Sequence, residues 1–372
     1  MVGIMFDVEA IEAEYFTLDE FKFKNRKVLK DTNVEYITFG TPKYDEDGVI
    51  SNAVIYFHGS SGSCHSARRI SEDMGSGEIF DTDKFFFISL SALGSPGSAS
   101  PSTTGLMNEF PEYDVEDMVN FQKQFIEEKF GITHVKGLIG NSMGGFEVLT
   151  WGCIYPDSVD FIVSLVSSFK VGGHNYALSK IMNNILESDP DYNGGAYDLP
   201  LSDSLKRSLK LSSDAMYCYG LSREEYRNNM SNDEIMEAMA EFAEESLEED
   251  PNDLIYMNKS SMDYDLTEQL GDITAKVLII AINQDQYFPP NLDAIPMSKM
   301  IKDNKLLIFD SCMGHVGSNE LFKIKDDVEE FIKEFRDAWS FKISLIFYFN
   351  DFFYFLQYYS IIILIIYSKS LF

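Results

Sequence analysis

The chain contains a series of short apolar segments that are typical of buried β-strands. Each segment is rich in β-branched and aromatic residues and is followed by glycine, serine, asparagine or aspartate. The segments are residues 53–57, 85–90, 135–139, 161–166, 276–282 and 305–309. Residues 21–29 and 34–39 instead alternate between apolar and polar positions, which predicts two further strands joined by a turn at residues 31–33.

Segments with helical spacing lie between these strands. Apolar positions recur at helical intervals in residues 115–130 and in residues 146–155, where Pro156 ends the pattern. A last helix is predicted over residues 326–339. Buried strands that alternate with helices predict an α/β protein, with a mainly parallel sheet covered by helices on both faces.

The pattern changes in the middle of the chain, where no convincing strand is present. Residues 233–253 predict one helix with an apolar side, formed by Ile235, Met239, Phe242 and Leu247. The same window holds ten acidic residues and no basic one, which we interpret as a solvated helix face. We therefore predict one core of sheet and covering helices at residues 1–170 and 270–340, with a helical lid inserted at residues 171–269.

The last residues, 341–372, form an apolar tail. Residues 352–367 are nearly all apolar, but this run is shorter than the roughly 20 residues needed to span a bilayer. Asn350 and Asp351 interrupt any longer span. Three interpretations remain open, in order of preference: a non-native extension, a membrane tail or an oligomer contact. A membrane partner is expected only if the tail is genuine.

Charge limits the partners of the chain. It carries 30 basic and 60 acidic side chains, a formal net charge of −30. Such a surface repels phosphate backbones, so nucleic acid is not an expected partner. Residues 1–20 contain no basic segment followed by an apolar run, so no secretory signal is predicted and a cytoplasmic enzyme is expected.

The cysteines show neither disulfide nor metal spacing. No pair forms a CxxC motif, and Cys64 and His65 near His58 lack a local carboxylate or second cysteine. We therefore expect reduced cysteines and no metal. The four cysteines are Cys64, Cys153, Cys218 and Cys312.

A candidate nucleophile follows the apolar segment 135–139. Residues 140–144 read Gly-Asn-Ser-Met-Gly and fit G-x-S-x-G between a predicted strand and a predicted helix. This context exposes the hydroxyl of Ser142 above the sheet. The helix start directs the N–H of Met143 at a developing oxyanion, and the N–H of Ser60, after an earlier strand, is the second candidate donor.

A candidate acid and base follow two late strands. Asp285 is the one carboxylate in the loop after residues 276–282, and His315 lies in the loop after the last strand. In the order Ser142, Asp285, His315, histidine takes the serine proton and aspartate fixes the histidine tautomer. His58 is expected to be a structural loop residue, because the base should follow the serine.

Several further segments resemble the homoserine O-acetyltransferase family over residues 21–339. They are residues 34–41, 52–54, 83–86, 93–98, 110–111, 115–119, 142–145, Trp151, 155–156, 189–195 and the surroundings of Asp285 and His315. The resemblance implies an α/β-hydrolase fold, no permanent cofactor, and acetyl-CoA as the co-substrate that acylates Ser142. It also implies that a small hydroxyl compound accepts the acyl group and that the lid forms a homodimer.

Two positions depart from that family. Its members have an aspartate after the catalytic histidine, which holds the substrate amine, whereas this chain has Val316. They also have a lid arginine in a Tyr-Arg context, whereas the stretch ending in Tyr219 has none, and Arg223 or Arg227 is the nearest substitute. Both charged contacts for a zwitterion are thus absent, and poor use of homoserine is predicted.

Three functions compete at this point. The first is an acyltransferase that acts on small molecules, and the second is an esterase or thioesterase with the same triad. The sequence leaves these two open, because they differ in how water is excluded. The third, a non-catalytic binding protein on a hydrolase fold, is disfavoured by the complete set of Ser142, Asp285 and His315.

Overall fold

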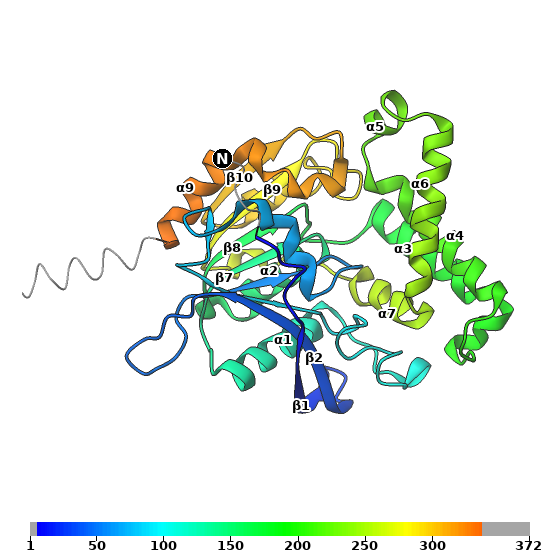
Figure 1. Ribbon diagram of the computed structural model, residues 1–372, viewed down its shortest axis with the longest axis horizontal. Helices are drawn as coiled ribbons and strands as arrows, with labels where there is room; N and C mark the ends of the chain where they lie inside the picture. The colour runs from blue at the N-terminus through cyan, green and yellow to red at the C-terminus, as the bar shows by residue number, and fades with distance from the viewer. Residues whose placement is uncertain (1–5, 337–372) are drawn as a thin grey trace, which may run out of the picture.

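The computed structural model describes residues 6–336 and is built around one twisted eight-stranded sheet (Figure 1). The strand order is β1-β2-β6-β3-β7-β8-β9-β10; β1, β2 and β6 pair antiparallel, and all later pairings are parallel. The strands are β1 (Glu14–Lys22), β2 (Val28–Gly40), β3 (Ala53–Phe57), β6 (Phe86–Leu90), β7 (Val135–Asn141), β8 (Val159–Leu165), β9 (Lys276–Ile282) and β10 (Asn304–Phe309). The predicted α/β-hydrolase type of sheet is confirmed.

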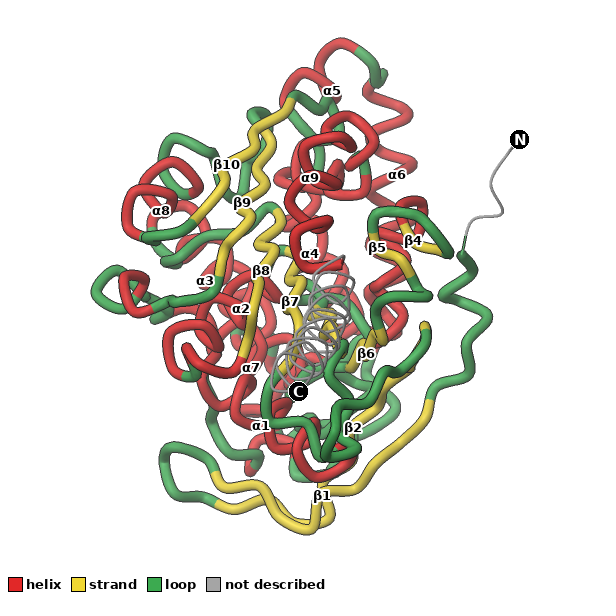
Figure 2. Tube along the Cα trace, turned by 90° about the vertical axis from the view of Figure 1, so that its left-hand side faces the viewer, coloured by secondary structure: helices red, strands yellow, loops and turns green. Residues whose placement is uncertain are grey.

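Two apolar cores cover the two faces of this sheet, because successive side chains of a strand point in opposite directions. In β9, Val277 and Ile279 join one core, whereas Leu278 and Ile280 join the other. Helices α1 (Val115–Phe130), α2 (Met143–Ile154) and α8 (Ala294–Met300) pack on the first face, and η1 (Cys64–Asp73) and α9 (Lys325–Arg336) on the second. Figure 2 shows β7 to β10 side by side between these layers.

The predicted turn at residues 31–33 is wrong. The hairpin turn lies between β1 and β2, where the N–H of Phe23 donates to the carbonyl of Lys27 and Arg26 adopts a positive φ of 70°. Asp31 and Asn33 lie inside β2, and the φ of 51° at Asp31 is accommodated within the strand. Turn-forming residue types misled the prediction, because pairing with β1 determines where the chain reverses.

A helical segment, residues 172–269, projects from the sheet between β8 and β9 (Figure 1). It has a small apolar core of its own, which includes Leu186, Leu205 and Ile255. Its helices are α3 (Gly173–Glu187), α4 (Asp203–Gly220), α5 (Arg223–Asn228), α6 (Asn232–Glu245) and α7 (Pro251–Met262). Short 3-10 turns accompany them at η4 (Pro190–Gly195) and η5 (Ser246–Glu248), and η6 (Leu270–Asp272) leads from the segment into β9.

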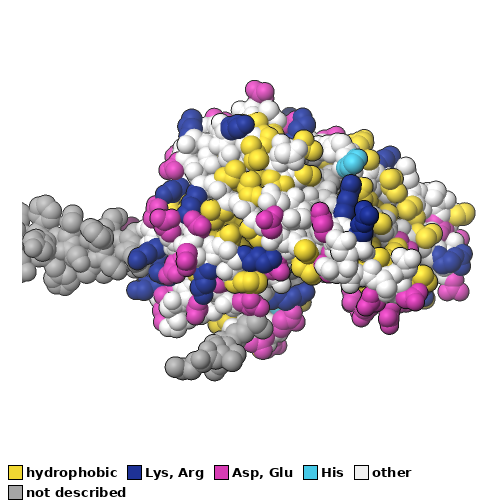
Figure 3. Space-filling model, turned by 90° about the horizontal axis from the view of Figure 1, so that it is seen from above, with side chains coloured by type: hydrophobic (Ala, Val, Ile, Leu, Met, Phe, Trp, Pro, Cys, Tyr) yellow, Lys and Arg dark blue, Asp and Glu magenta, His cyan; other side chains and the backbone are white. Residues whose placement is uncertain are grey.

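The single helix predicted over residues 233–253 is in fact two helices. Helix α6 ends at Glu245, and α7 starts at Pro251 behind Asp250, whose side chain accepts hydrogen bonds from the N–H groups of Asn252 and Asp253. An aspartate cap followed by proline at the first helical position is a strong helix start. The acidic side chains of α6 are exposed, and Figure 3 shows Asp and Glu gathered at the outer edge of this lobe.

The remaining elements are short. The two-stranded sheet of β4 (Met74–Gly75) and β5 (Phe80–Asp81) follows η1, and the 3-10 turns are η2 (Met107–Glu109), η3 (Pro156–Ser158), η7 (Gly314–Asn319) and η8 (Leu321–Ile324). The helix predicted for residues 326–339 is described as far as Arg336, and the tail at 341–372 lies outside the described residues. Among residues 6–336, no helix is both long and apolar enough to cross a membrane.

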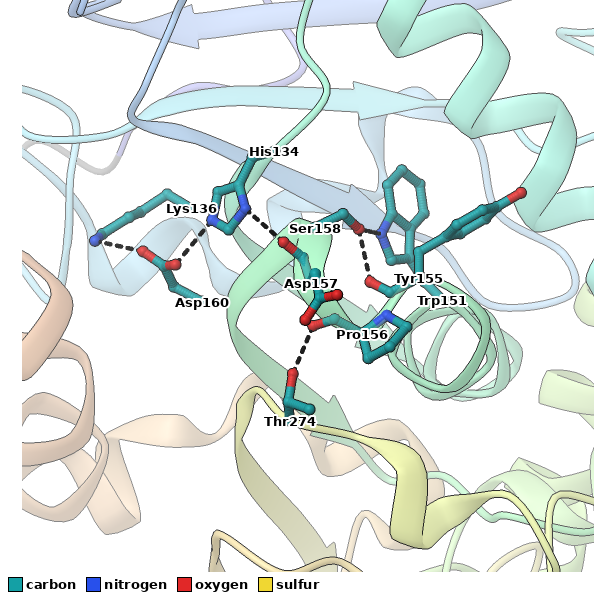
Figure 4. Close-up of polar contacts among 9 residues, drawn as sticks. All are labelled: His134, Lys136, Trp151, Tyr155, Pro156, Asp157, Ser158, Asp160 and Thr274. Atoms are coloured by element: carbon teal, nitrogen blue, oxygen red, sulfur yellow. Dashed lines mark hydrogen bonds and ion pairs between the residues drawn. The ribbon is translucent and has the colours of Figure 1, made fainter.

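A polar cluster joins the amino ends of β7 and β8 (Figure 4). The ring nitrogens of His134 lie 2.9 Å from the carbonyl of Asp157 and 2.8 Å from Oδ1 of Asp160, and Lys136 Nζ lies 2.7 Å from Oδ2 of Asp160. The hydrogen bond to Asp160 raises the pKa of His134. Although burial opposes it, hydrogen bonds from His134 and Lys136 lower the pKa of Asp160 to about 2. These contacts fix the sheet edge opposite the carboxyl ends of the strands.

Candidate active site

Ser142 occupies a sharp turn between β7 and α2, with φ 56° and ψ −117°. A non-glycine residue in this region is strained, and such strain is found at functional sites. The surrounding glycines are required by close packing. A Cβ on Gly140 would lie 2.1 Å from the carbonyl oxygen of Gly144, and a Cβ on Gly144 would lie 2.2 Å from that of Phe57. The turn therefore presents the serine hydroxyl at the carboxyl edge of the sheet.

A continuous line of hydrogen bonds joins Ser142 to two loops at this edge. Oγ of Ser142 lies 2.9 Å from Nε2 of His315, and Nδ1 of His315 lies 2.8 Å from Oδ2 of Asp285. The structure thus brings together the three residues that the sequence order predicted to meet. In such an arrangement the imidazole can take the serine proton while the carboxylate fixes its tautomer.

The loop after β9 holds Asp285 and His315 in place. The Asp285 side chain is fully buried, and its second oxygen accepts hydrogen bonds from the N–H groups of Tyr287 (2.8 Å) and Phe288 (3.1 Å). The ring centroids of Tyr287 and Phe288 lie 4.7 and 5.5 Å from that of His315. Packing against these two aromatic rings holds the imidazole in the orientation in which Nδ1 contacts Asp285 and Nε2 contacts Ser142.

Ser60 and Met143, the two candidate oxyanion donors, both lie at the cavity that contains Ser142. Neither the N–H of Ser60 nor that of Met143 donates a hydrogen bond to another described residue. Both residues line the cavity that contains Ser142, and Met143 begins α2, where the helix dipole favours negative charge. The arrangement can stabilise an oxyanion beside Ser142.

The side chain of His58 stabilises the loop that contains Ser60. Its Nδ1 lies 2.6 Å from the carbonyl oxygen of Gly59, and its Nε2 accepts the N–H of Ala92 at 2.9 Å. Complete burial lowers the pKa of His58, so the ring is neutral and both nitrogens are used. This agrees with the structural role expected from the sequence.

A cavity of about 480 Å³ opens above Ser142. Val316 contributes an apolar wall beside His315. The cavity is lined mainly by Gly59, Ser60, Ser61, Arg68, Arg69, Asn141, Ser142, Met143, Phe146, Asn175, Leu178, Ser179, Met182, Met216, Tyr217, Leu221, Tyr226, Phe242, Met257, Asn258, Ser261, Tyr287, Phe288, His315 and Val316. Residues of the sheet domain form its floor, and residues of the helical segment form its roof.

Three proposed substrate contacts are not brought to the cavity wall. Tyr219 packs its ring 5.5 Å from that of Tyr287, and Arg223 Nε donates to Oε1 of Gln286 at 3.0 Å. Arg227 is exposed on α5. The prediction chose them by their position in the sequence, whereas the path of α4 and α5 directs them elsewhere.

Arg68, Arg69 and Asn175 also line the cavity, although the sequence did not predict them as site residues. The two arginines follow the Ser60 loop directly, and that position was a usable signal. Asn175 donates from Nδ2 to the carbonyl of Tyr287 at 2.6 Å, while its buried Oδ1 has no partner among the described residues. No pattern in the sequence indicated Asn175, because its place depends on how α3 packs against the loop that carries Tyr287.

The helical segment is fastened to the loops that carry Asp285 and His315. Nε2 of Gln286 donates to the carbonyl of Leu221 at 2.7 Å, and the N–H of Ser222 donates to the carbonyl of Cys312 at 3.2 Å. Gly314, with φ 56°, packs so closely that a Cβ would lie 2.7 Å from the nitrogen of Ser222. These contacts hold the roof of the cavity in register with its floor. Within residues 6–336, no group of three or more metal-binding side chains gathers.

Known proteins resemble this chain over most of its length. The family model for the alpha/beta hydrolase fold matches residues 52–318. A probable acyltransferase of Methanothermobacter thermautotrophicus is 46% identical over 87% of this chain and 99% of the relative. A homoserine O-acetyltransferase of Methanosalsum zhilinae is 30% identical over 75% of this chain, which spans 63% of that relative's length.

Solved structures share the architecture. An acetylester hydrolase from Corynebacterium glutamicum superposes with a TM-score of 0.77 at 23% identity, over 87% of this chain and 96% of the other. A homoserine O-acetyltransferase from Bacillus anthracis gives a TM-score of 0.74 at 21% identity, over 87% and 97%. The chain therefore belongs to the α/β-hydrolase fold family, where its relatives include the homoserine O-acetyltransferases.

Proposed function

We propose that the protein is a cytoplasmic acyltransferase that forms an acyl-enzyme on Ser142, with acetyl-CoA as donor and a small hydroxyl compound as acceptor. The observation that carries the proposal is the hydrogen-bonded line from Ser142 through His315 to Asp285, at the floor of a cavity. A serine hydroxyl is a weak nucleophile until an adjacent base accepts its proton, and this line supplies the base.

In the first half of the reaction, Nε2 of His315 takes the hydroxyl proton while Oγ of Ser142 attacks the donor carbonyl carbon. The resulting oxyanion accepts hydrogen bonds from the N–H groups of Ser60 and Met143. The carbonyl re-forms as the bond to the leaving thiolate breaks, and the thiolate takes the proton from His315. Asp285 stabilises the imidazolium that exists between these steps.

In the second half, the acceptor hydroxyl gives its proton to His315 and attacks the acyl carbon on Ser142. Collapse of this second intermediate releases the ester, and the proton returns to Oγ of Ser142. Water in place of the hydroxyl compound would make the protein an esterase or thioesterase. We favour transfer because a probable acyltransferase is 46% identical over nearly its whole length. The comparison that separates the two is the ratio of ester to free acid among the products.

We also propose that the helical segment acts as a lid and carries a homodimer contact. Large apolar side chains are exposed on three of its helices: Tyr176 (44%) and Ile181 (51%) on α3, Leu211 (56%) on α4 and Met236 (69%) on α6. Exposed apolar side chains that gather into a patch mark protein interfaces, and a contact between two copies over α3, α4 and α6 would cover these four side chains.

The nucleophile gives the test of the proposed function. Replacing Ser142 with alanine should lower turnover by about 10⁴-fold or more and abolish labelling by a fluorophosphonate, because the attacking oxygen is removed. The measurement is mass spectrometry of the labelled protein together with the rate of release of coenzyme A from acetyl-CoA.

The matched control is Ser179→Ala, which removes another hydroxyl from the same cavity. It should keep both labelling and turnover. Undiminished labelling of the Ser142→Ala protein would remove Ser142 from the mechanism, and a wild-type protein that reacts with neither probe would favour the non-catalytic alternative.

A further inference from the structure

Two arginines stand at the edge of the cavity, outside the machinery described above. Arg68 and Arg69 lie on η1, which follows the Ser60 loop, and both line the cavity. Helix η1 packs against η7, the turn that carries His315 and Val316. The cations are therefore held on the side of the cavity that the base occupies.

Arg69 is half-buried and has no ion pair or hydrogen-bond partner among residues 6–336. This is unusual in a chain with 60 acidic side chains against 30 basic ones. Arg68 differs, because its Nη1 lies 3.0 Å from Oε1 of Glu9, in a pair whose side chains are 55% and 62% exposed. A partly buried guanidinium without a partner loses solvation that a bound anion would restore.

The rest of the cavity wall contains no compensating carboxylate. Arg68 and Arg69 are the two permanently charged side chains among its described lining residues, and none of those residues is Asp or Glu. Val316 is apolar at the position next to His315. The wall can thus pair with a negative group, but it offers an ammonium group no ionic partner.

We propose that Arg69, assisted by Arg68, binds an anionic oxyacid group of the substrate, and that this substrate has no neighbouring ammonium. The inference rests on the proposed acyl transfer and names the substrate class for it. A guanidinium donates two parallel N–H groups, which match the oxygens of a carboxylate or a phosphate. The net charge of −30 repels anions at a distance, so this local cation determines whether one is held.

The anionic group has two sources, and the test has one arm for each. The donor arm compares acetyl-CoA with S-acetyl-N-acetylcysteamine, a thioester that lacks the phosphates. The acceptor arm compares 4-hydroxybutyrate, a monoanion with the carbon chain of homoserine, with neutral 1,4-butanediol. Each pair changes the charge while keeping the reacting thioester or hydroxyl.

The variants are Arg69→Gln and, as matched control, Arg227→Gln, which removes the same charge from an exposed position outside the cavity. In Arg69→Gln, kcat/KM for the anionic member of one pair should fall by about tenfold to a hundredfold, as expected when a hydrogen bond to a charged group is lost. The neutral member should change less than about threefold, and Arg69→Lys should restore part of the loss. The arm that shows the difference identifies the source of the anion.

Equal losses for the charged and neutral members, or equal effects of Arg69→Gln and Arg227→Gln, would overturn the inference. A binding measurement keeps this failure separate from failure of the proposed reaction. Coenzyme A and 4-hydroxybutyrate are titrated by calorimetry into Ser142→Ala and Ser142→Ala/Arg69→Gln proteins, which cannot turn over. Binding that depends on Arg69 supports the anion site even if no acyl transfer is found, and binding of neither ligand to the Ser142→Ala protein contradicts it.

Discussion

At the scale of single residues, two features shape the site: glycines that let the backbone pack closely around Ser142, and an apolar residue beside His315. Gly140 and Gly144 permit the turn that strains Ser142, since any Cβ there would collide with backbone. Val316 acts in the opposite sense, because it places an apolar group beside the imidazole of His315. Neither effect is a direct chemical step, but both decide which substrate atoms can reach Ser142.

Replacing Val316 with aspartate should improve the use of homoserine as acceptor. The new carboxylate can pair with the ammonium group, whereas an ammonium beside valine has no partner, and each 1.4 kcal/mol is about tenfold in efficiency. We expect kcat/KM for homoserine with acetyl-CoA to rise severalfold and that for 4-hydroxybutyrate to fall.

Val316→Asn is the control, because asparagine has nearly the same shape as aspartate without the charge. It should not give the gain. A wild-type kcat/KM for homoserine of about 10⁴ M⁻¹s⁻¹ or more would show that other residues bind the zwitterion.

At the scale of elements, the first turn of α2 lines the cavity, and the rest of the helix packs against α1. Glu147 of α2 is completely buried, and Oε2 accepts a hydrogen bond from Nε2 of Gln122, while Oε1 has no partner within the described chain. Burial raises the pKa of Glu147 from 4.5 to about 8, so the side chain is protonated at neutral pH. The helix that begins beside Ser142 is thus anchored by a neutral carboxylic acid.

Glu147→Gln should stabilise the protein at alkaline pH. A carboxyl whose pKa is higher in the folded state than in the unfolded state binds more protons when folded, so stability falls as pH rises between those two values. The loss therefore spans pH 4.5 to about 8 and is on the order of a few kcal/mol. Glutamine resembles the protonated form and does not titrate, so its advantage should grow across this range.

The measurement is urea unfolding of both proteins at pH 5 and about pH 8.5, followed by tryptophan fluorescence. Glu237→Gln, at an exposed position of α6, is the control and should parallel the wild type. A constant difference in unfolding free energy between wild type and Glu147→Gln at both pH values would show that Glu147 does not titrate in this range.

At the scale of the whole molecule, the described sheet, site and helical segment all lie within residues 6–336. The last helix, α9, buries Val328, Phe331 and Ile332 against the sheet face opposite α1 and α2. The strands that carry Ser142, Asp285 and His315 precede it. The contacts described for the site lie within residues 6–336.

Deleting residues 341–372 should leave the thermal midpoint within about 2 °C and the acyl-transfer rate unchanged, because a shift of that size corresponds to well under 1 kcal/mol in a chain of this length. The comparison uses the full chain and the truncated chain under the same conditions. Deleting residues 325–372 is the control, since it removes α9 and should unfold the protein. Loss of activity or of membrane association on the shorter deletion would assign the tail a function.

The sequence by itself determined the parallel strands and the order of Ser142, Asp285 and His315. Strands buried on both faces must be apolar along their whole length, so residues 53–57 or 276–282 stand out without any partner. A loop residue that follows such a strand lies at a known edge of the sheet, which is why the three residues could be expected to meet. The glycines around Ser142 also indicated a tight turn at the end of the strand, because such a turn leaves no room for a Cβ.

Only the tertiary structure decided the hairpin, the division of α6 from α7 and the wall of the cavity. The turn at Phe23–Lys27 depends on pairing between β1 and β2, and turn-forming residues at 31–33 say nothing of that register. Likewise, Arg69 faces the cavity while Arg223 and Arg227 do not, because the packing of η1 against η7 and the path of α5 set these directions. Each segment shows in its own residues whether it is buried, so the strands could be predicted from the sequence. The wall of the cavity is formed where segments distant in sequence meet, so its residues could not.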